Sequence, residues 1–155
     1  MPTTSAGILL YRRTATGPEV LLGHMGGPFW ARKDDGAWSL PKGEHGPDED
    51  PRAGARREFE EELGSPVPAE HLVPLGAHRV TSAKVLQVWA AEGDLDATAT
   101  RSNTFELERP PRSGRMQEFP EIDRAAGFPV AEARAKVLKG QCPSSTVSWP
   151  CWVRR

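Results

Sequence analysis

Short apolar runs separated by turn-forming residues recur along the chain, and they predict a β-sheet. The first two runs are residues 7–11 and 19–23, and the turn-prone Thr16, Gly17 and Pro18 lie between them. Runs of this length bounded by Gly and Pro are typical of strands. We expect strands in three later segments as well: residues 38–40, 85–91 and 103–107.

One segment has the four-residue repeat of an amphipathic helix. Its apolar stripe is made by Ala55, Phe59 and Leu63. Asp50 suits the N-cap position and Pro51 the first helical residue. Gly64 suits the left-handed residue that ends a helix, and Pro66 cannot continue one. A second helix is predicted over residues 129–139, with Gly140 as its stop.

Acidic residues gather beside this apolar stripe. At about 100° per residue, Glu58, Glu61 and Glu62 share an arc of about 100° on the helix. The stripe is expected to seat the helix on a sheet, with the acidic edge at the rim lined by solvent. Glu60 points away from both faces, so we expect it to be exposed.

Two interpretations of these carboxylates are open. Crowded carboxylates repel one another, and their oxygen atoms suit Mg²⁺, with Mn²⁺ as the alternative. A divalent cation held there would favour attack of water on a phosphorus atom. A run of charges can instead be a solvated helix face beside Arg56 and Arg57, and for an isolated run that reading is the more common.

The wider spacing favours the metal. The chain reads Gly43-x5-Glu49-x7-Arg57-Glu58-Phe59-x-Glu61-Glu62-x-Gly64-Ser65. This pattern resembles the Nudix box, except that Ser65 stands where the box usually has an aliphatic residue. The resemblance implies an α/β fold, an α/β/α sandwich around a mixed sheet. It also implies hydrolysis of a nucleoside diphosphate linked to another group.

The resemblance also implies roles for individual residues. Glu61 and Glu62 match metal-ligating glutamates. Glu58 matches the glutamate that acts as a ligand, as the base for the attacking water, or as both. Gly43 would offer its carbonyl to the metal. Arg57 would orient a neighbouring carboxylate, with Glu49 as its ionic partner.

Outside the box, Nudix enzymes often recruit a further acid from a distant loop, and Glu121 is favoured here over Glu118. Lys42 is the best candidate for phosphate contact. Arg112 and Arg115 are further candidates, because arginine binds phosphate through two hydrogen bonds. Trp30 could stack on a base.

Two segments resemble a bacterial branch of the superfamily predicted to cleave nucleoside polyphosphates. They are residues 34–43 and the arginine-rich residues 101–115. The leading hypothesis is therefore a metal-dependent pyrophosphohydrolase acting on a small nucleotide-type substrate. The alternative is a Nudix-fold nucleotide sensor without catalysis.

Composition limits the partners and the cellular location that we expect for this protein. The 155 residues carry a net charge of −1, so no global field attracts nucleic acid or an anionic membrane. We expect one domain over residues 1–155, with an atypical tail at 141–155. Cys142 and Cys151 fit free thiols of a cytoplasmic protein. The sequence leaves the oligomeric state open, a homodimer included.

Overall fold

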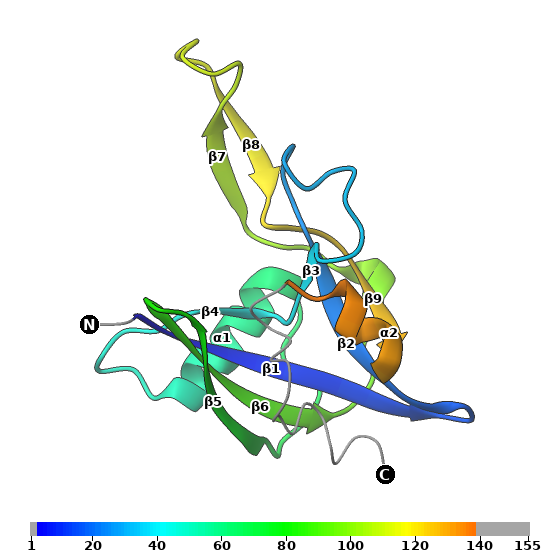
Figure 1. The fold of residues 1–155 in the computed structure, drawn as a ribbon. Helices are drawn as coiled ribbons and strands as arrows, with labels where there is room; N and C mark the ends of the chain where they lie inside the picture. The colour runs from blue at the N-terminus through cyan, green and yellow to red at the C-terminus, as the bar shows by residue number, and fades with distance from the viewer. Residues whose placement is uncertain (1–2, 139–155) are drawn as a thin grey trace.

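A mixed β-sheet forms the centre of the computed structural model, which describes residues 3–138 (Figure 1). Its seven strands are β1 (Thr3–Thr14), β2 (Gly17–Met25), β3 (Trp38–Ser39), β4 (Lys42–Glu44), β5 (Val73–Thr81), β6 (Lys84–Glu92) and β9 (Ile122–Pro129). Five of them follow the order β3-β2-β1-β6-β5, while β4 pairs with β1 and β9 with β2. β1 and β6 are parallel, and the other pairs are antiparallel.

Two helices cover opposite faces of the sheet, α1 (Pro51–Leu63) and α2 (Val130–Lys136). Alternate side chains of β1 point to the two faces, as they do in any strand. Ile8 and Leu10 join Phe59 of α1 in one core cluster, whereas Leu9 joins Ala133 of α2 in the other. The predicted α/β/α sandwich around a mixed sheet is confirmed.

Helix α1 begins and ends where its capping residues predict. Gly64 adopts the left-handed conformation with φ 79°, and its N–H donates to Glu60 O at 2.7 Å. This backbone conformation favours glycine, because glycine carries no Cβ that would clash. Asp50 holds the N-cap position, but its side chain makes no capping hydrogen bond. The C-terminal cap therefore rests on a hydrogen bond that the N-terminal cap lacks.

The sequence patterns missed strands β5 and β9 and made the second helix too long. Helix α2 ends at Lys136 because Val137 leaves it to form a bridge with Trp38 at the edge of the sheet. The N–H of Leu138 then donates to Trp38 O at 2.7 Å. Gly140, the expected stop, lies outside the described residues.

A β-hairpin projects from the body of the molecule (Figure 1). It consists of β7 (Thr104–Glu108), β8 (Met116–Pro120) and the connecting residues 109–115, and we call residues 104–120 the arm. The arm forms a two-stranded sheet of its own. The expected strand at 103–107 is thus present, and the arginine-rich segment after it is the tip of the arm. A short 3₁₀ turn, η1 (Ala97–Ala99), precedes the arm.

None of the helices in residues 3–138 is long and apolar enough to cross a membrane. The tail at 141–155 and both cysteines lie outside the described residues.

Candidate functional site

Gly43 and Glu58 lie in close contact in this structure. Strand β4 pairs with β1, and helix α1 packs beside it on the same part of the sheet. This packing brings the carboxyl group of Glu58 against the backbone of Gly43 so closely that a Cβ at residue 43 would overlap it. With Glu58 in this position only glycine fits at residue 43, and its backbone lies directly beside the Glu58 carboxyl group.

Arg57 organises three of the carboxylates. Its Nε and Nη2 atoms donate to the two carboxylate oxygens of Glu49, each at 2.9 Å. Its Nη1 donates to Glu58 Oε1 at 2.8 Å and lies 3.3 Å from Glu61 Oε1. The hydrogen bonds to Glu49 are the largest cause of a raised Arg57 pKa. One guanidinium therefore fixes the position of Glu58 while Glu49 fixes the guanidinium.

Glu62 is buried, which corrects the expectation of a solvent-lined acidic face. Its residue is 6% exposed, and Oε1 accepts a hydrogen bond from the backbone N–H of Lys42 at 3.1 Å. Burial raises the Glu62 pKa to about 8, against the lowering effect of the Lys42 N–H and ammonium. The helix geometry alone could not foresee this, because β4 covers that side of α1. Glu60 is exposed, as predicted.

The remaining acids add negative charge that Arg57 does not balance. The Glu58 side chain is 14% exposed, and its burial raises its pKa. Arg57 acts in the opposite direction, while the charges of Glu61 and Glu121 raise the Glu58 pKa further. Glu121 and Glu58 likewise raise the Glu62 pKa. The cluster thus holds more carboxylates than cations in a poorly hydrated position.

The chemistry of this cluster fits a divalent cation. Carboxylate oxygens are the ligands that Mg²⁺ and Mn²⁺ prefer, and a cation would offset the mutual repulsion of these groups. Within residues 3–138, however, no three His, Cys, Asp or Glu side chains converge as a metal site. The donor set is present, and in this conformation Arg57 and the Lys42 N–H occupy part of it.

A pocket of about 270 Å³ lies beside the buried glutamate. Its wall combines apolar and charged side chains: Met25, Gly26, Trp30, Ser39, Lys42, Glu62, Phe105, Glu121 and Ile122. Trp30 comes from the loop after β2, and Phe105 comes from the root of the arm. Trp30 and Phe105 therefore border the same cavity as Glu62 and Glu121.

The Nudix domain family model matches residues 1–145, most of the chain. The chain belongs to the Nudix family. Membership supports a hydrolase of nucleotide pyrophosphate bonds, and Nudix hydrolases generally use divalent metal ions. No curated protein matches the chain.

Three solved structures show the same fold at low sequence identity. A MutT/nudix family protein from Enterococcus faecalis is 19% identical with a TM-score of 0.55, covering 83% of this chain and 44% of that one. A C. elegans Ap4A hydrolase binary complex is 21% identical with a TM-score of 0.52, covering 84% and 82%. The NUDIX domain of Shewanella oneidensis NrtR, complexed with ADP ribose, is 15% identical with a TM-score of 0.57, covering 89% and 79%.

The two candidate acids outside the Nudix box lie in different places. Glu121 lines the pocket, where the N–H of Gly26 donates to its backbone oxygen at 2.9 Å. Gly26 is packed so tightly against Pro120 that a Cβ would overlap it, and this contact holds Glu121 beside the pocket. Glu118 instead lies on the arm, directly across from Glu106.

Arg112 and Arg115 are not among the residues that line the pocket beside Glu62. They belong to the tip of the arm, which points away from α1 in Figure 1. Lys42 does line the pocket, so it is the predicted phosphate contact that the fold brings to the carboxylates.

A buried histidine holds the loop that carries Trp30, and no spacing pattern in the chain indicates this role. His24 is fully buried, with Nδ1 at 2.9 Å from Asp123 Oδ1 and Nε2 at 2.7 Å from the backbone oxygen of Lys33. Its ring also meets the edge of Trp38, with centroids 5.1 Å apart. His24 thus ties the loop to β9 and packs against the core.

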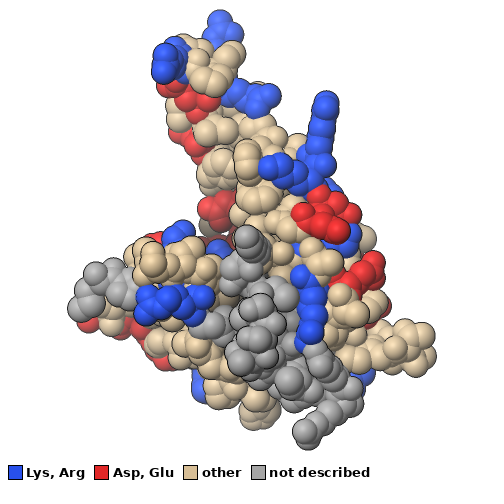
Figure 2. All heavy atoms as spheres, in the orientation of Figure 1, with Lys and Arg blue, Asp and Glu red and all other residues tan. Residues whose placement is uncertain are grey.

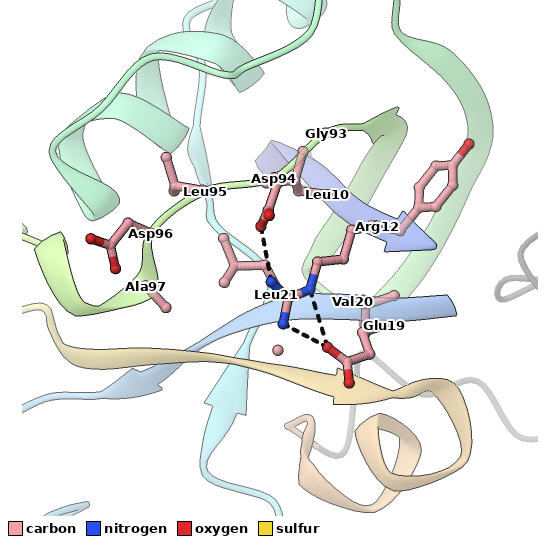
Figure 3. A pocket seen from close by; sticks show the side chains of 12 residues that line it. Leu10, Arg12, Glu19, Val20, Leu21, Gly93, Asp94, Leu95, Asp96 and Ala97 are labelled. Atoms are coloured by element: carbon pink, nitrogen blue, oxygen red, sulfur yellow. Dashed lines mark hydrogen bonds and ion pairs between the residues drawn. The ribbon is translucent and has the colours of Figure 1, made fainter. Parts of the chain in front are cut away.

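A second pocket, of about 430 Å³, lies where β1 and β2 meet the segment after β6 (Figure 3). Arg12 spans it, donating to Glu19 Oε1 through Nε at 3.1 Å and to Asp94 Oδ1 through Nη1 at 3.0 Å. These carboxylates are 23% and 69% exposed. Because one arginine faces two acids here and neither acid is buried, this pocket lacks the excess of buried charge found around Glu62.

Proposed function

We propose that this protein is a metal-dependent Nudix hydrolase that cleaves a diphosphate linkage in a nucleoside diphosphate linked to another moiety. Nucleoside triphosphates and dinucleoside polyphosphates are the substrate types that we favour. The observation that carries the proposal is the position of Glu62 and Glu121. Both are acids that line the same small cavity as Trp30 and Phe105.

The residues that would hold the metal are the carboxylates Glu58, Glu61, Glu62 and Glu121, with the backbone carbonyl of Gly43. A bound Mg²⁺ or Mn²⁺ would neutralise phosphate charge and lower the pKa of bound water. The raised pKa values of Glu58 and Glu62 support this assignment, since each reports a carboxylate whose charge is poorly compensated in the protein alone.

Glu58 is the residue best placed to accept a proton from the attacking water. Burial raises its pKa from the ordinary value, which makes the carboxylate a stronger base. Its hydrogen bond from Arg57 at 2.8 Å fixes its orientation. Its carboxyl group also lies against the backbone of Gly43. The chain therefore holds this base in one place, as general-base catalysis requires.

The pocket wall supports a nucleotide-type substrate. Trp30 and Phe105 offer aromatic faces on which any nucleobase can stack. Lys42 lies on the same wall next to Glu62 and can contact a phosphate group. The base would then lie toward the loop and the arm, and the scissile diphosphate toward α1. Among the similar structures, one is an Ap4A hydrolase complex and another holds ADP ribose, which supports a substrate of the nucleotide type.

The test is hydrolysis of a substrate panel by the purified full chain. The panel holds dinucleoside polyphosphates, nucleoside triphosphates, ADP-ribose and nucleotide sugars, each with Mg²⁺, with Mn²⁺ or with EDTA. We expect release of a nucleoside monophosphate that requires the metal. We also expect Glu62→Gln to lower turnover by about 100-fold or more, because it removes one anionic ligand.

Glu60→Gln is the matched control, since it makes the same change on the exposed side of the same helix. Full activity of Glu62→Gln on every substrate that the wild type cleaves would refute the site assignment. Tight nucleotide binding by calorimetry without turnover, in either metal, would support the sensor alternative instead.

A further inference from the structure

The arm carries its charges in two separate groups. Its strands hold three glutamates and no basic residue: Glu106, Glu108 and Glu118. Its tip holds three arginines and no acidic residue: Arg109, Arg112 and Arg115. Figure 2 shows the same separation, with Lys and Arg at the end of the arm and Asp and Glu below it.

The three glutamates share one face of the hairpin. Glu106 lies directly across from Glu118, and Glu108 lies directly across from Met116. Paired residues and every second residue of a strand point to the same side. The other face carries Phe105 and Phe119, whose rings lie 6.0 Å apart. Phe105 on that face covers Gly27 at the pocket, so the acidic face is directed away from the pocket.

These charges have no partners within the described part of the chain. None of the six side chains makes an ion pair with another residue of 3–138. Placing Glu106 opposite Glu118 is itself unfavourable, because like charges across a strand pair repel. Met116 is 56% exposed beside these glutamates. An isolated two-stranded hairpin is only marginally stable in water, so further contacts would stabilise it.

We propose that the acidic face and basic tip of the arm bind the arm of a second copy of this chain. In a twofold arrangement the two arms lie antiparallel, which places the arginines of each tip over the glutamates of the other arm. Such an interface is self-complementary, because the same patch supplies both signs of charge. Each five-residue strand is about 17 Å long, so tip and strands of two arms can overlap along their whole length.

The surface of the tip suits this arrangement. It is hollowed by an open cavity of about 700 Å³, which is lined by Leu107, Glu108, Arg109, Pro110, Pro111 and Arg112. An apolar side chain of the second arm, such as Met116, can enter a hollow of this kind while the charged groups pair around it. Apolar contacts surrounded by polar ones are the usual build of a protein interface.

The test is sedimentation equilibrium of the full chain at several salt concentrations. We expect a species of twice the 17.0 kDa chain mass. Its dissociation constant should rise about 10-fold or more from low to high salt, since exposed charge pairs are screened. A wild type that stays monomeric at low salt and about 100 μM would overturn the proposal and leave the arm for a partner of another kind.

Charge reversal with mixing locates the interface. Arg112→Glu with Arg115→Glu should dissociate the dimer, and so should Glu106→Lys with Glu118→Lys. Mixing these two double variants should restore a two-chain species. In the mixed dimer the reversed tip of one chain meets the reversed strands of the other, and the remaining tip and strands both keep their wild-type charges. Failure of the mixture to associate, or a dimer that survives both reversals, would contradict the arm as the interface.

Arg52→Glu with Arg79→Glu is the matched control. Both arginines are exposed and lie outside the arm, and the change in net charge is the same as for the tip variant. We expect this control to remain a dimer, and its dissociation would show an effect of total charge and overturn the proposal. None of these positions lies in the pocket, so the result does not depend on whether the enzyme assignment is right.

Discussion

Two arginines in this protein each bridge carboxylates, and their surroundings differ. Arg57 contacts Glu49, Glu58 and Glu61, and its network borders the buried Glu62. Arg12 contacts two carboxylates that water also reaches. In the first cluster the acids outnumber the arginine, and burial raises the pKa values of Glu58 and Glu62.

The comparison separates the cluster proposed as the catalytic site from one that only links strands, by physical criteria. The second pocket is the larger, yet neither carboxylate that pairs with Arg12 is as well covered as Glu58 or Glu62. Uncompensated charge in a poorly hydrated position is costly, and a fold retains it where chemistry or a ligand uses it. Volume alone therefore does not select the proposed site, and charge balance favours the pocket beside the Nudix box.

Replacing the two arginines is the most direct way to break this comparison. We expect Arg57→Ala to lower kcat/KM by about 100-fold, since Glu58 loses the hydrogen bond that orients it. Arg12→Ala should leave kcat/KM within about twofold of the wild type, because its pairs are remote from the cluster and exposed. Steady-state kinetics with Mg²⁺ on the best substrate of the panel measures both. Equal losses in the two variants would remove the distinction between the clusters.

The pH dependence of stability sharpens the comparison further. The folded-state pKa of Glu62, about 8, lies above its ordinary value of 4.5, so the folded protein binds this proton more tightly than the unfolded chain does. The resulting stabilisation is complete below pH 4.5 and is lost as pH rises through about 8. In EDTA, the free energy of unfolding should therefore fall by about 2–4 kcal/mol from pH 5 to 9 on account of this group.

Urea unfolding at several pH values measures this slope. Glu62→Gln cannot ionise, so it should remove most of the decline and be more stable than the wild type at pH 9. Glu60→Gln, on the exposed side of α1, should keep the wild-type slope. An unchanged slope in Glu62→Gln would mean that Glu62 is hydrated and that the burial argument fails.

Much of the acidic site could be predicted from sequence because it is local. Gly43 through Gly64 are joined by one loop and one helix, so spacing alone brings Glu58, Glu61 and Arg57 together. The burial of Glu62 could not be predicted in this way. It depends on β4 lying over that side of α1, and a helical projection carries no information on what packs against the helix.

The pocket wall and the position of the arm could not be predicted from the sequence, because both depend on contacts between distant parts of the chain. Phe105 reaches the pocket through its packing on Gly27, and no spacing rule connects the two. Strand β9 lacks the β-branched run typical of strands, yet it pairs with β2 along its length. The tip arginines have the composition of a phosphate site, and composition does not reveal that they stand on a projecting hairpin.

Replacing the aromatic residues that line the pocket beside Glu62 should give the smallest effect. These replacements test whether this pocket also binds the nucleobase. Trp30→Ala and Phe105→Ala should each raise KM by about 5–20-fold with little change in kcat, because stacking of a base contributes binding in ground and transition states alike. Phe29→Ala is the matched control, since Phe29 is 67% exposed and lies beside Trp30 without lining the pocket. If Phe29→Ala raised KM as much as Trp30→Ala, the effect would belong to the loop as a whole. If neither pocket aromatic changed KM, the nucleobase would lie elsewhere, and the cavity beside Glu62 would serve only the phosphates.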